Sequence, residues 1–251
     1  MSGEIVTAAA LVIGNEILSG RTQDANLAYL GQQLNLLGIR LREARVVADV
    51  EADVVAAVNE LRARYDYLFT TGGIGPTHDD ITSECVAKAF GVPLIRHPEA
   101  ERRLRAHYAP DKINDARLRM ANTPAGATLI DNPVSVAPGY RMENVFVLAG
   151  VPAIMRAMFD SLKSQLKGGA PVLAVTVPAY LAEGTIAKDL GALQERFADI
   201  EIGSYPFFRL GRFGTSLVLR GTNQARLDRA AEELRQLVRA LGAEPLDHEP
   251  D

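Results

Sequence analysis

The stretch that decides the fold is Thr71-Gly72-Gly73-Ile74-Gly75-Pro76-Thr77-His78-Asp79-Asp80. Its first residue ends a segment, 67–71, that reads as a strand, and the stretch precedes residues 82–90, which read as a helix. Glycines at such a junction let backbone N–H groups approach an anion, and the helix N-terminus adds a favourable dipole. The segment lacks the Gly-Lys-Ser/Thr ending of a P-loop and the Gly-x-Gly-x-x-Gly pattern of dinucleotide-binding loops. It therefore predicts a phosphate loop of a different kind.

Strand-like and helix-like segments alternate on the N-terminal side of this loop. Residues 6–13 form a continuous apolar run, which is typical of a strand buried on both faces. Leucines recur at helical spacing from Leu27 to Leu37, residues 39–47 read as a second strand, and residues 54–61 mark a second helix. This alternation predicts right-handed crossovers and a largely parallel sheet.

On the C-terminal side, residues 98–120 are polar and helix-prone. Their arginines could reach a ligand phosphate, but a solvated helical face is the favoured interpretation: Arg102, Arg103, Arg105, Arg117 and Arg119. Short strands are predicted at 128–130, 137–141 and 145–148, and a helix is predicted from Pro152 to Leu162.

A domain boundary is predicted at residues 167–171, which read Lys-Gly-Gly-Ala-Pro. The pattern that follows predicts a strand at 172–178, a helix at 183–197, strands at 200–204 and 215–221, and a helix at 227–241. We therefore predict one domain over residues 1–167 and a small β-α-β-β-α subdomain over residues 172–243.

Composition narrows the possible partners and the compartment. The chain has 251 residues, 47% of them hydrophobic, and a net charge of −4, so no nucleic-acid partner is expected. The apolar run at 6–13 is too short to cross a bilayer and lacks the flanks of a signal peptide, so no membrane partner is expected. A single cysteine, Cys85, fits a reducing cytoplasm, and a buried helix position is a better interpretation of it than a nucleophile.

The acids near the glycines admit two interpretations. Asp79 and Asp80 could be a helix N-cap and a first-turn acid. However, a second loop, 14–20, follows the first strand and could bring Glu16 to the same edge of the sheet. Carboxylates next to a bound phosphate repel it unless a cation lies between them, and Mg²⁺ is the usual one. We therefore predict that Asp79, Asp80 and Glu16 hold a divalent metal or position an attacking water.

Residues after the second loop could face the same crevice. Asp24 is a natural N-cap for the helix that contains Leu27, yet Asp24 and Asn26 could also reach a ligand. Asn132 and the turn Ala137-Pro138-Gly139 could line the far wall, with simple turn chemistry as the alternative.

These motifs resemble a known family. Gly14-Asn15-Glu16-Ile17-Leu18-x-Gly20, together with Asp24, Asn26 and the run from Thr71 to Thr82, resembles the molybdopterin-binding (MoaB/MogA-like) domain family. In particular, the motifs look like the N-terminal domain of competence/damage-inducible protein A (CinA), over roughly residues 5–165. The segment Ile202-Gly203-Ser204-Tyr205-Pro206 is similar, more weakly, to the molybdopterin-binding-like half of eukaryotic FAD synthases.

The resemblance implies a three-layer α/β/α fold with a mostly parallel sheet, plus the small C-terminal α/β subdomain. It also implies a nucleotide-like or molybdopterin ligand and self-association as a dimer or trimer. The implied substrate-binding residues are Gly14, Asn15, Asp24, Asn26, Thr71, Gly72, Gly73, Gly75, Thr77, Thr82, Pro138 and Gly139.

The resemblance also separates two chemical branches. Molybdopterin adenylyltransferases carry Arg-Asp where this chain has Asp79-Asp80, and exchanging a cation for an acid favours metal binding over direct phosphate pairing. The Asp-Asp form looks like the CinA and FAD-synthase branch, whose members hydrolyse ADP-ribose or FAD. We therefore expect a Mg²⁺-assisted dinucleotide pyrophosphatase. A non-catalytic binding module and an adenylyltransferase are the alternatives.

The chain departs from the family pattern in two ways. The amidohydrolase domain of CinA proteins and the adenylyl-transferring domain of FAD synthases have no counterpart here, so deamidation and FAD synthesis are not expected. In addition, Ala149 stands where the family usually has a proline, which leaves that wall of the pocket less restrained.

Overall fold

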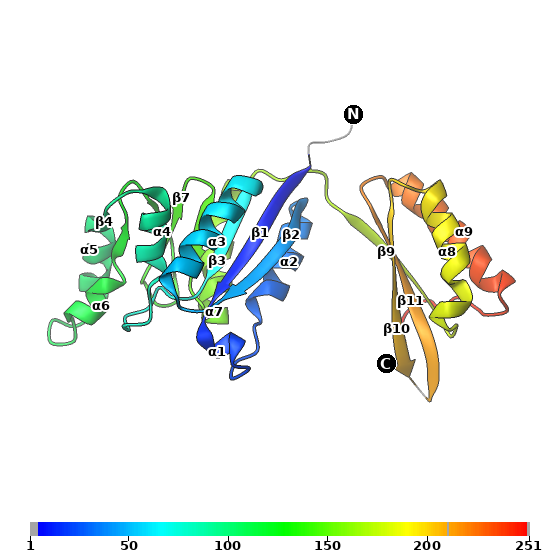
Figure 1. Ribbon diagram of the computed structural model, residues 1–251, viewed down its shortest axis with the longest axis horizontal. Helices are drawn as coiled ribbons and strands as arrows, with labels where there is room; N and C mark the ends of the chain where they lie inside the picture. The colour runs from blue at the N-terminus through cyan, green and yellow to red at the C-terminus, as the bar shows by residue number, and fades with distance from the viewer. Residues whose placement is uncertain (1–4, 210, 250–251) are drawn as a thin grey trace. The chain divides into compact units, whose positions relative to one another are not determined.

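The computed structural model describes residues 5–209 and 211–249, which divide into two compact units at Gly169/Ala170 (Figure 1). Among these residues, no helix is both long and apolar enough to cross a bilayer. The elements of the first unit are, in chain order, β1 (Val6–Ile13), α1 (Asn15–Leu18), α2 (Asn26–Leu36), β2 (Ile39–Val47), α3 (Glu51–Arg64), β3 (Tyr67–Thr71), α4 (Thr82–Phe90), β4 (Leu94–Arg96), α5 (Pro98–His107), α6 (Asp115–Arg119), β5 (Asn122–Pro124), β6 (Thr128–Ile130), β7 (Gly139–Met142), β8 (Val145–Leu148) and α7 (Pro152–Leu162), followed by a short 3₁₀ turn (Lys163–Gln165).

A six-stranded sheet forms the centre of the first unit, with the strand order β2-β1-β3-β8-β7-β6. The four strands β2, β1, β3 and β8 run parallel, and β7 is antiparallel to both of its neighbours. The predicted mostly parallel sheet is therefore confirmed. Because β1, β3 and β8 are adjacent and parallel, the loops that follow them meet at one edge of the sheet.

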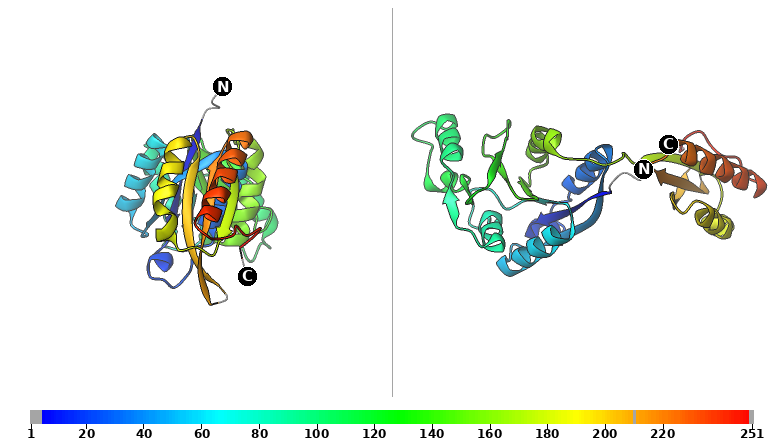
Figure 2. Two further views of the ribbon diagram at one scale, coloured as in Figure 1. Left: turned by 90° about the vertical axis from the view of Figure 1, so that its right-hand side faces the viewer. Right: turned by 90° about the horizontal axis from the view of Figure 1, so that it is seen from above.

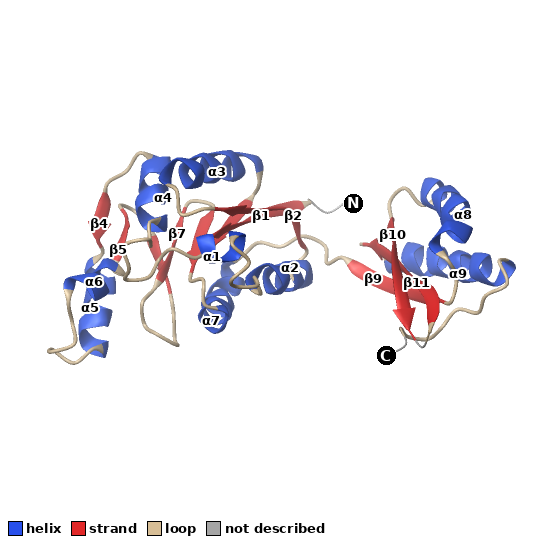
Figure 3. Ribbon diagram, turned by 60° about the horizontal axis from the view of Figure 1, so that its bottom comes forward, coloured by secondary structure: helices blue, strands red, loops and turns tan. Residues whose placement is uncertain are grey.

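Helices cover both faces of this sheet, as the alternating side chains of β1 show. Ala8 and Ala10 pack in a cluster with residues of α2 and α7, whereas Ala9 and Leu11 pack with residues of α3 and α4. Figure 3 shows α3 and α4 on one side of the sheet and α2 and α7 on the other. Successive residues of a strand point to opposite faces, so a strand buried on both faces is apolar throughout. The predicted three-layer α/β/α fold is confirmed.

The region 94–124 departs from its prediction. Two helices, α5 and α6, occupy the polar segment, but β4 and β5 also pair antiparallel with each other on its flanks. Three-residue strands are too short to show a period of two, so the pattern did not predict them. A small core of Ala100, Leu104 and Ala121 supports this lobe. Similarly, the strand predicted at 137–141 begins only at Gly139, after the Pro138 turn.

The second unit contains β9 (Leu173–Ala179), α8 (Glu183–Arg196), β10 (Glu201–Arg209), β11 (Arg212–Gly221) and α9 (Gln224–Ala240). Its sheet is antiparallel with the order β10-β11-β9, and α8 and α9 pack on one face of it through a core that includes Leu217 and Leu219 (Figure 2). The β-α-β-β-α order agrees with the pattern. The hairpin of β10 and β11 extends beyond the predicted strands. The prediction stopped short because the exposed end of the hairpin lacks the apolar alternation that marks a buried strand.

The Cys85 thiol is expected to react with Ellman's reagent at pH 8 only after the protein is denatured. Cys85 lies in α4 with no exposed surface, and burial raises the pKa of its thiol to about 11. The thiolate is the reactive form, and burial both disfavours that form and blocks the reagent. Denaturation in guanidinium should release one equivalent of thiol. A stoichiometric reaction of the native protein within minutes would show that α4 opens readily.

Candidate functional site

A cavity of about 370 Å³ lies at the edge of the first unit's sheet where β1, β3 and β8 end. Its wall includes Glu16 from the loop after β1, the glycines Gly72, Gly73 and Gly75 after β3, and Gly150 after β8. Open α/β sheets bind ligands at this place. The volume falls within the usual range for a small-molecule site, roughly 300–1,000 Å³.

The first two glycines after β3 are required by packing as well as by any ligand. Gly72 has φ 102°, and a Cβ there would lie 2.2 Å from the backbone oxygen of Ile13. Gly73 has φ 68°, and its Cβ would lie 2.1 Å from Oγ1 of Thr82. The Thr82 hydroxyl donates to the Gly72 carbonyl at 2.9 Å, and Thr82 is fully buried. Thr82 thus fixes the glycine turn from behind and does not line the cavity.

The carboxylate of Asp80 is hydrogen-bonded to Thr77 within the same loop. Its Oδ2 accepts hydrogen bonds from the backbone N–H of Thr77 at 2.8 Å and from the Thr77 hydroxyl at 2.5 Å. Asp80 also lines the cavity. The N-cap interpretation is wrong, because α4 starts at Thr82 after Ile81 and has no side-chain cap within the described chain. Asp80 therefore shapes the loop before the helix and not the helix terminus itself.

Asp79 and His78 point away from this arrangement. The Asp79 side chain is 62% exposed and the His78 side chain is 97% exposed. Neither residue is part of the cavity wall. The two neighbouring acids are thus separated, with Asp80 facing the cavity and Asp79 facing outward.

Glu16 reaches the cavity from a short helix. The segment predicted as an irregular loop contains α1, which places Glu16 in its single turn and leaves Asn15 exposed outside the cavity wall. Gly14 leaves room for the Glu16 carboxylate in this position, because a Cβ there would lie 2.6 Å from its oxygens. Two carboxylates, Glu16 and Asp80, therefore share one cavity from different loops.

The predicted three-carboxylate metal centre is not assembled. Within residues 5–209 and 211–249, no three His, Cys, Asp or Glu side chains gather closely enough to hold an ion. Asp79 is 62% exposed and does not join Glu16 and Asp80 in the cavity wall. The remaining donors, Glu16 and Asp80, still suit Mg²⁺, which is commonly held by one or two protein carboxylates together with substrate oxygens and water.

A smaller pocket of about 60 Å³ adjoins the main cavity and shares Glu16, Gly72 and Gly150 with its wall. Asp24 and Asn26 also line it, so the structure brings both residues to the crevice. Asp24 lies one residue before Ala25, the N-cap of α2, and its Oδ1 accepts from the N–H of Leu27 in the first turn at 2.8 Å. The Asn26 amide donates to the Gly150 carbonyl at 2.7 Å and so ties α2 to the loop after β8.

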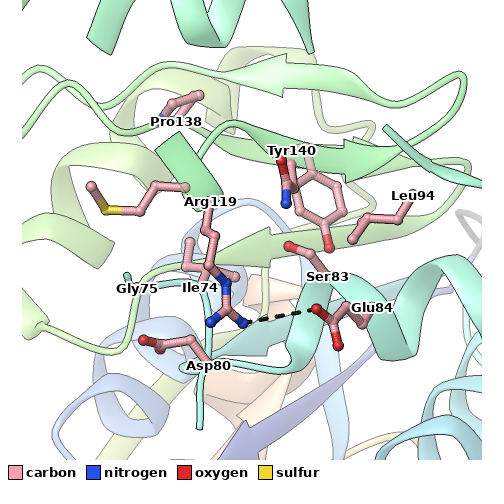
Figure 4. A pocket seen from close by; sticks show the side chains of 11 residues that line it. Ile74, Gly75, Asp80, Ser83, Glu84, Leu94, Arg119, Pro138 and Tyr140 are labelled. Atoms are coloured by element: carbon pink, nitrogen blue, oxygen red, sulfur yellow. Dashed lines mark ion pairs between the residues drawn. The ribbon is translucent and has the colours of Figure 1, made fainter. Parts of the chain in front are cut away.

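A side pocket that shares Asp80 with the main cavity contains Arg119, which forms a loose ion pair with Glu84 at 3.8 Å (Figure 4). The buried ring of Tyr140 points into it beside Ser83, and burial raises the pKa of the Tyr140 phenol. Pro138 also lines this pocket, whereas Gly139 packs against the Val147 carbonyl, whose oxygen is 2.4 Å from where a Cβ would lie.

The arginines of α5 pair with acids at the surface, as expected for a solvated face: Arg102, Arg103 and Arg105 with Glu99, Glu101 and Asp131.

Asn132 organises the opposite wall of the main cavity. Its Oδ1 accepts from the N–H groups of Val134 and Ser135, and its amide donates to the Ala137 carbonyl at 2.8 Å. Asn132, Ser135 and Ala137 all line the cavity. This network holds Val136 at φ 67°, a conformation that β-branched residues rarely adopt.

Replacing Val136 by asparagine is expected to raise the free energy of unfolding by about 0.5–1 kcal/mol, because asparagine tolerates a positive φ and valine does not. Urea denaturation measures the change. Val134→Asn, in the same loop but without a positive φ, is the matched control and should give no gain. A destabilised Val136→Asn protein would mean that contacts of the valine side chain outweigh the backbone strain.

Apolar residues complete the cavity and were not predicted as site residues. Ile74, Met120, Ile154 and Met158 line it, and the last two come from α7. The helical stripe of α7 in the sequence marks these residues only as core, because a pattern of apolar positions does not distinguish a core from a cavity wall. Such a wall suits the flat apolar face of a base.

Residues 9–168 match the family described as "Probable molybdopterin binding domain". The chain belongs to this family. Residues 171–245 match a second description, "FAD synthase, middle domain". The resemblance inferred from the glycine motifs is therefore confirmed, and both compact units have a counterpart among known domains.

This molybdopterin-binding-domain protein is similar to CinA-like proteins and to a probable FAD synthase. It is 32% identical to a CinA-like protein from Desulfovibrio desulfuricans over 95% of this chain and 55% of that one. It is also 32% identical to a probable FAD synthase from Caenorhabditis elegans, over 92% of this chain and 50% of that one. The chain thus spans about half the length of these two relatives. A crystal structure of CinA from Thermoplasma acidophilum, described as having unknown function, aligns with a TM-score of 0.60 and 33% identity, covering 63% of this chain and 96% of that one.

Ala149, where the resemblance led us to expect a proline, lies beside α7 in this molybdopterin-binding domain. Ala149 lines the cavity, and its backbone N–H contacts the sulfur of Met158 at 3.4 Å. A proline has no N–H to make this contact. The wall next to Gly150 is therefore in contact with Met158 of α7.

Proposed function

We propose that this protein is a metal-dependent pyrophosphatase that cleaves nucleotide-linked pyrophosphates such as ADP-ribose or FAD. The observation that carries the proposal is the cavity of about 370 Å³, where Glu16 and Asp80 face a run of glycine backbone from two different loops. The match of residues 171–245 to the middle domain of FAD synthases supports a flavin- or adenine-nucleotide ligand.

In this proposal different residues contact the phosphates, the base and the metal. Backbone around Gly72, Gly73 and Gly75 contacts the phosphates, and apolar groups such as Ile154 and Met158 contact a base. Glu16 and Asp80 hold the metal together with phosphate oxygens. When bound, the metal would neutralise developing charge and lower the pKa of an attacking water. Asp80 is oriented for this role by Thr77, whose two donors fix one carboxylate oxygen.

The direct test is to incubate purified protein with ADP-ribose or FAD in the presence of Mg²⁺, Mn²⁺ or Co²⁺. We expect release of AMP, detected by chromatography, and its loss on addition of a chelator. Heat-denatured protein controls for spontaneous hydrolysis. If a folded preparation released no AMP with any of the metals, the pyrophosphatase proposal would be wrong.

A binding module without turnover is the second candidate. The observation that favours it is the two-donor engagement of Asp80 Oδ2, together with the outward orientation of Asp79. In that case molybdopterin or a nucleotide would bind with equal affinity to the native protein and to Asp80→Ala, and neither would release product. The adenylyltransferase alternative predicts instead an adenylated product from ATP and molybdopterin, and the acid at position 79 argues against it.

A further inference from the structure

Two residues that line the small pocket each have a buried oxygen atom without a hydrogen-bond partner among the described residues. Asn26 is 4% exposed and Thr71 is 2% exposed, and both residues line the pocket. Asn26 Oδ1 and Thr71 Oγ1 form no hydrogen bond with any described residue. Most buried polar atoms have a partner, and leaving one unpaired costs about 1–3 kcal/mol. Their occurrence together in one pocket indicates that a ligand group completes them.

The chemistry of the pocket selects hydrogen-bond donors. Asn26 Oδ1 only accepts, Thr71 Oγ1 can accept or donate, and the Glu16 carboxylate beside them accepts. A phosphate group would be repelled by this set. A vicinal diol, with two hydroxyl donors that can also accept, fits it, and carboxylates commonly bind ribose hydroxyls in nucleotide sites.

The size of the pocket favours the edge of a sugar over a single ion as its occupant. Its volume is about 60 Å³, whereas a site for one water needs roughly 10–15 Å³. A bare cation held by these oxygens would need no more space than a water. A base would need more space and an apolar wall, which the main cavity offers.

The position of the pocket fits a nucleotide that spans both spaces. The pocket and the main cavity share Gly72 in their walls. A nucleotide whose phosphate lies against the glycine loop can therefore place its ribose next to Thr71. We infer that the pocket of Glu16, Asn26 and Thr71 binds the cis-diol of a ribose and makes the site specific for ribonucleotides over deoxyribonucleotides. This inference rests on the proposed nucleotide ligand, and it adds that the protein recognises the ribose hydroxyls of that nucleotide.

The experiment compares the binding of AMP, 2′-deoxy-AMP and 3′-deoxy-AMP by titration calorimetry in the presence of Mg²⁺. We expect the native protein to bind AMP at least about tenfold more tightly than either deoxy analogue, since a site built for a hydroxyl discriminates against its absence. Thr71→Val should weaken AMP binding about tenfold and bring the ratio of AMP to deoxy-AMP affinity close to one.

Thr70→Val is the matched control. Thr70 precedes Thr71 in β3, is also fully buried, and also has a hydroxyl with no partner among the described residues. It lies outside the small pocket, because successive residues of a strand face opposite sides. Valine has nearly the shape of threonine, so both variants should fold, and Thr70→Val should bind all three nucleotides as the native protein does.

Three results would overturn the inference. The first is equal affinity of the native protein for AMP and both deoxy analogues. The second is an equal loss of affinity for all three nucleotides in the Thr71→Val variant. The third is a rise in melting temperature with Mg²⁺ alone that disappears in Thr71→Val, which would make the pocket a cation site.

Failure of the inference and failure of the proposed function can be told apart. AMP release from ADP-ribose together with equal binding of ribo- and deoxynucleotides contradicts only the inference. A preference for AMP without any AMP release contradicts the pyrophosphatase proposal and supports the ribose pocket.

Discussion

Replacing Gly72 by alanine is expected to lower the free energy of unfolding by about 3–5 kcal/mol. Two costs add: alanine at φ 102° is strained by about 1–3 kcal/mol, and overpacking of a tight contact typically costs about 1–3 kcal/mol. The contact is severe because the new Cβ would lie 2.2 Å from the Ile13 carbonyl oxygen, which belongs to the neighbouring central strand and cannot rotate away.

Gly20→Ala is the matched control for this prediction. Gly20 also has a positive φ, 72°, but among the described residues nothing lies within 4 Å of the position of its Cβ. Only the backbone cost remains, about 1 kcal/mol. Guanidinium denaturation of both variants measures the difference. Similar midpoints for the two would mean that the approach of Gly72 to Ile13 is not a close contact in solution.

Replacing Asp80 by asparagine is expected to lower AMP release from ADP-ribose by about 100-fold or more, an effect on the order of losing a key electrostatic group in an active site. Asparagine retains an oxygen that can accept from both Thr77 donors, so the loop should keep its shape. The charge that would hold the metal is lost. The expected loss therefore lies in turnover, and the melting temperature should change little.

Asp79→Asn distinguishes the two acids. Its side chain is 62% exposed and lies outside the cavity wall, so its loss should lower AMP release by less than about tenfold. Steady-state kinetics at several Mg²⁺ concentrations measure both variants. An Asp79→Asn enzyme as impaired as Asp80→Asn would mean that Asp79 turns inward when ligand binds. An active Asp80→Asn enzyme would contradict the metal-holding role of Asp80.

The elements of the fold were largely predictable from local pattern. The bounds of β1, β2, β3, α4 and β8 coincide with the predicted segments, because each is a run of apolar or periodic residues between clear breakers. The missed pair β4 and β5 has three residues per strand and is stabilised only by mutual pairing and by the small core of the lobe. Such short elements leave no periodic trace in the sequence.

The candidate site was predictable in its location but not in its composition. Glycines and acids at strand ends indicated the edge of the sheet, and Glu16, Asp80, Asp24 and Asn26 lie there. Asn132 and Ala137, which were expected at the far wall, line the cavity as well. The apolar residues of α7 were not predicted as site residues, because their helical spacing is the same for a core position and for a cavity wall.

By itself the sequence determined the family, the alternating parallel architecture and the loop that lines the candidate site, because these depend on local patterns of apolar, glycine and acidic residues. Only the tertiary structure decided how the loop is used. It showed that Gly72 and Gly73 are glycines because the backbone of β1 and the side chain of Thr82 lie against them. It also separated Asp80 from Asp79, since Thr77 holds one carboxylate at the cavity while the other faces solvent. Which of two adjacent side chains points inward depends on the fold around them, and composition alone does not contain that information.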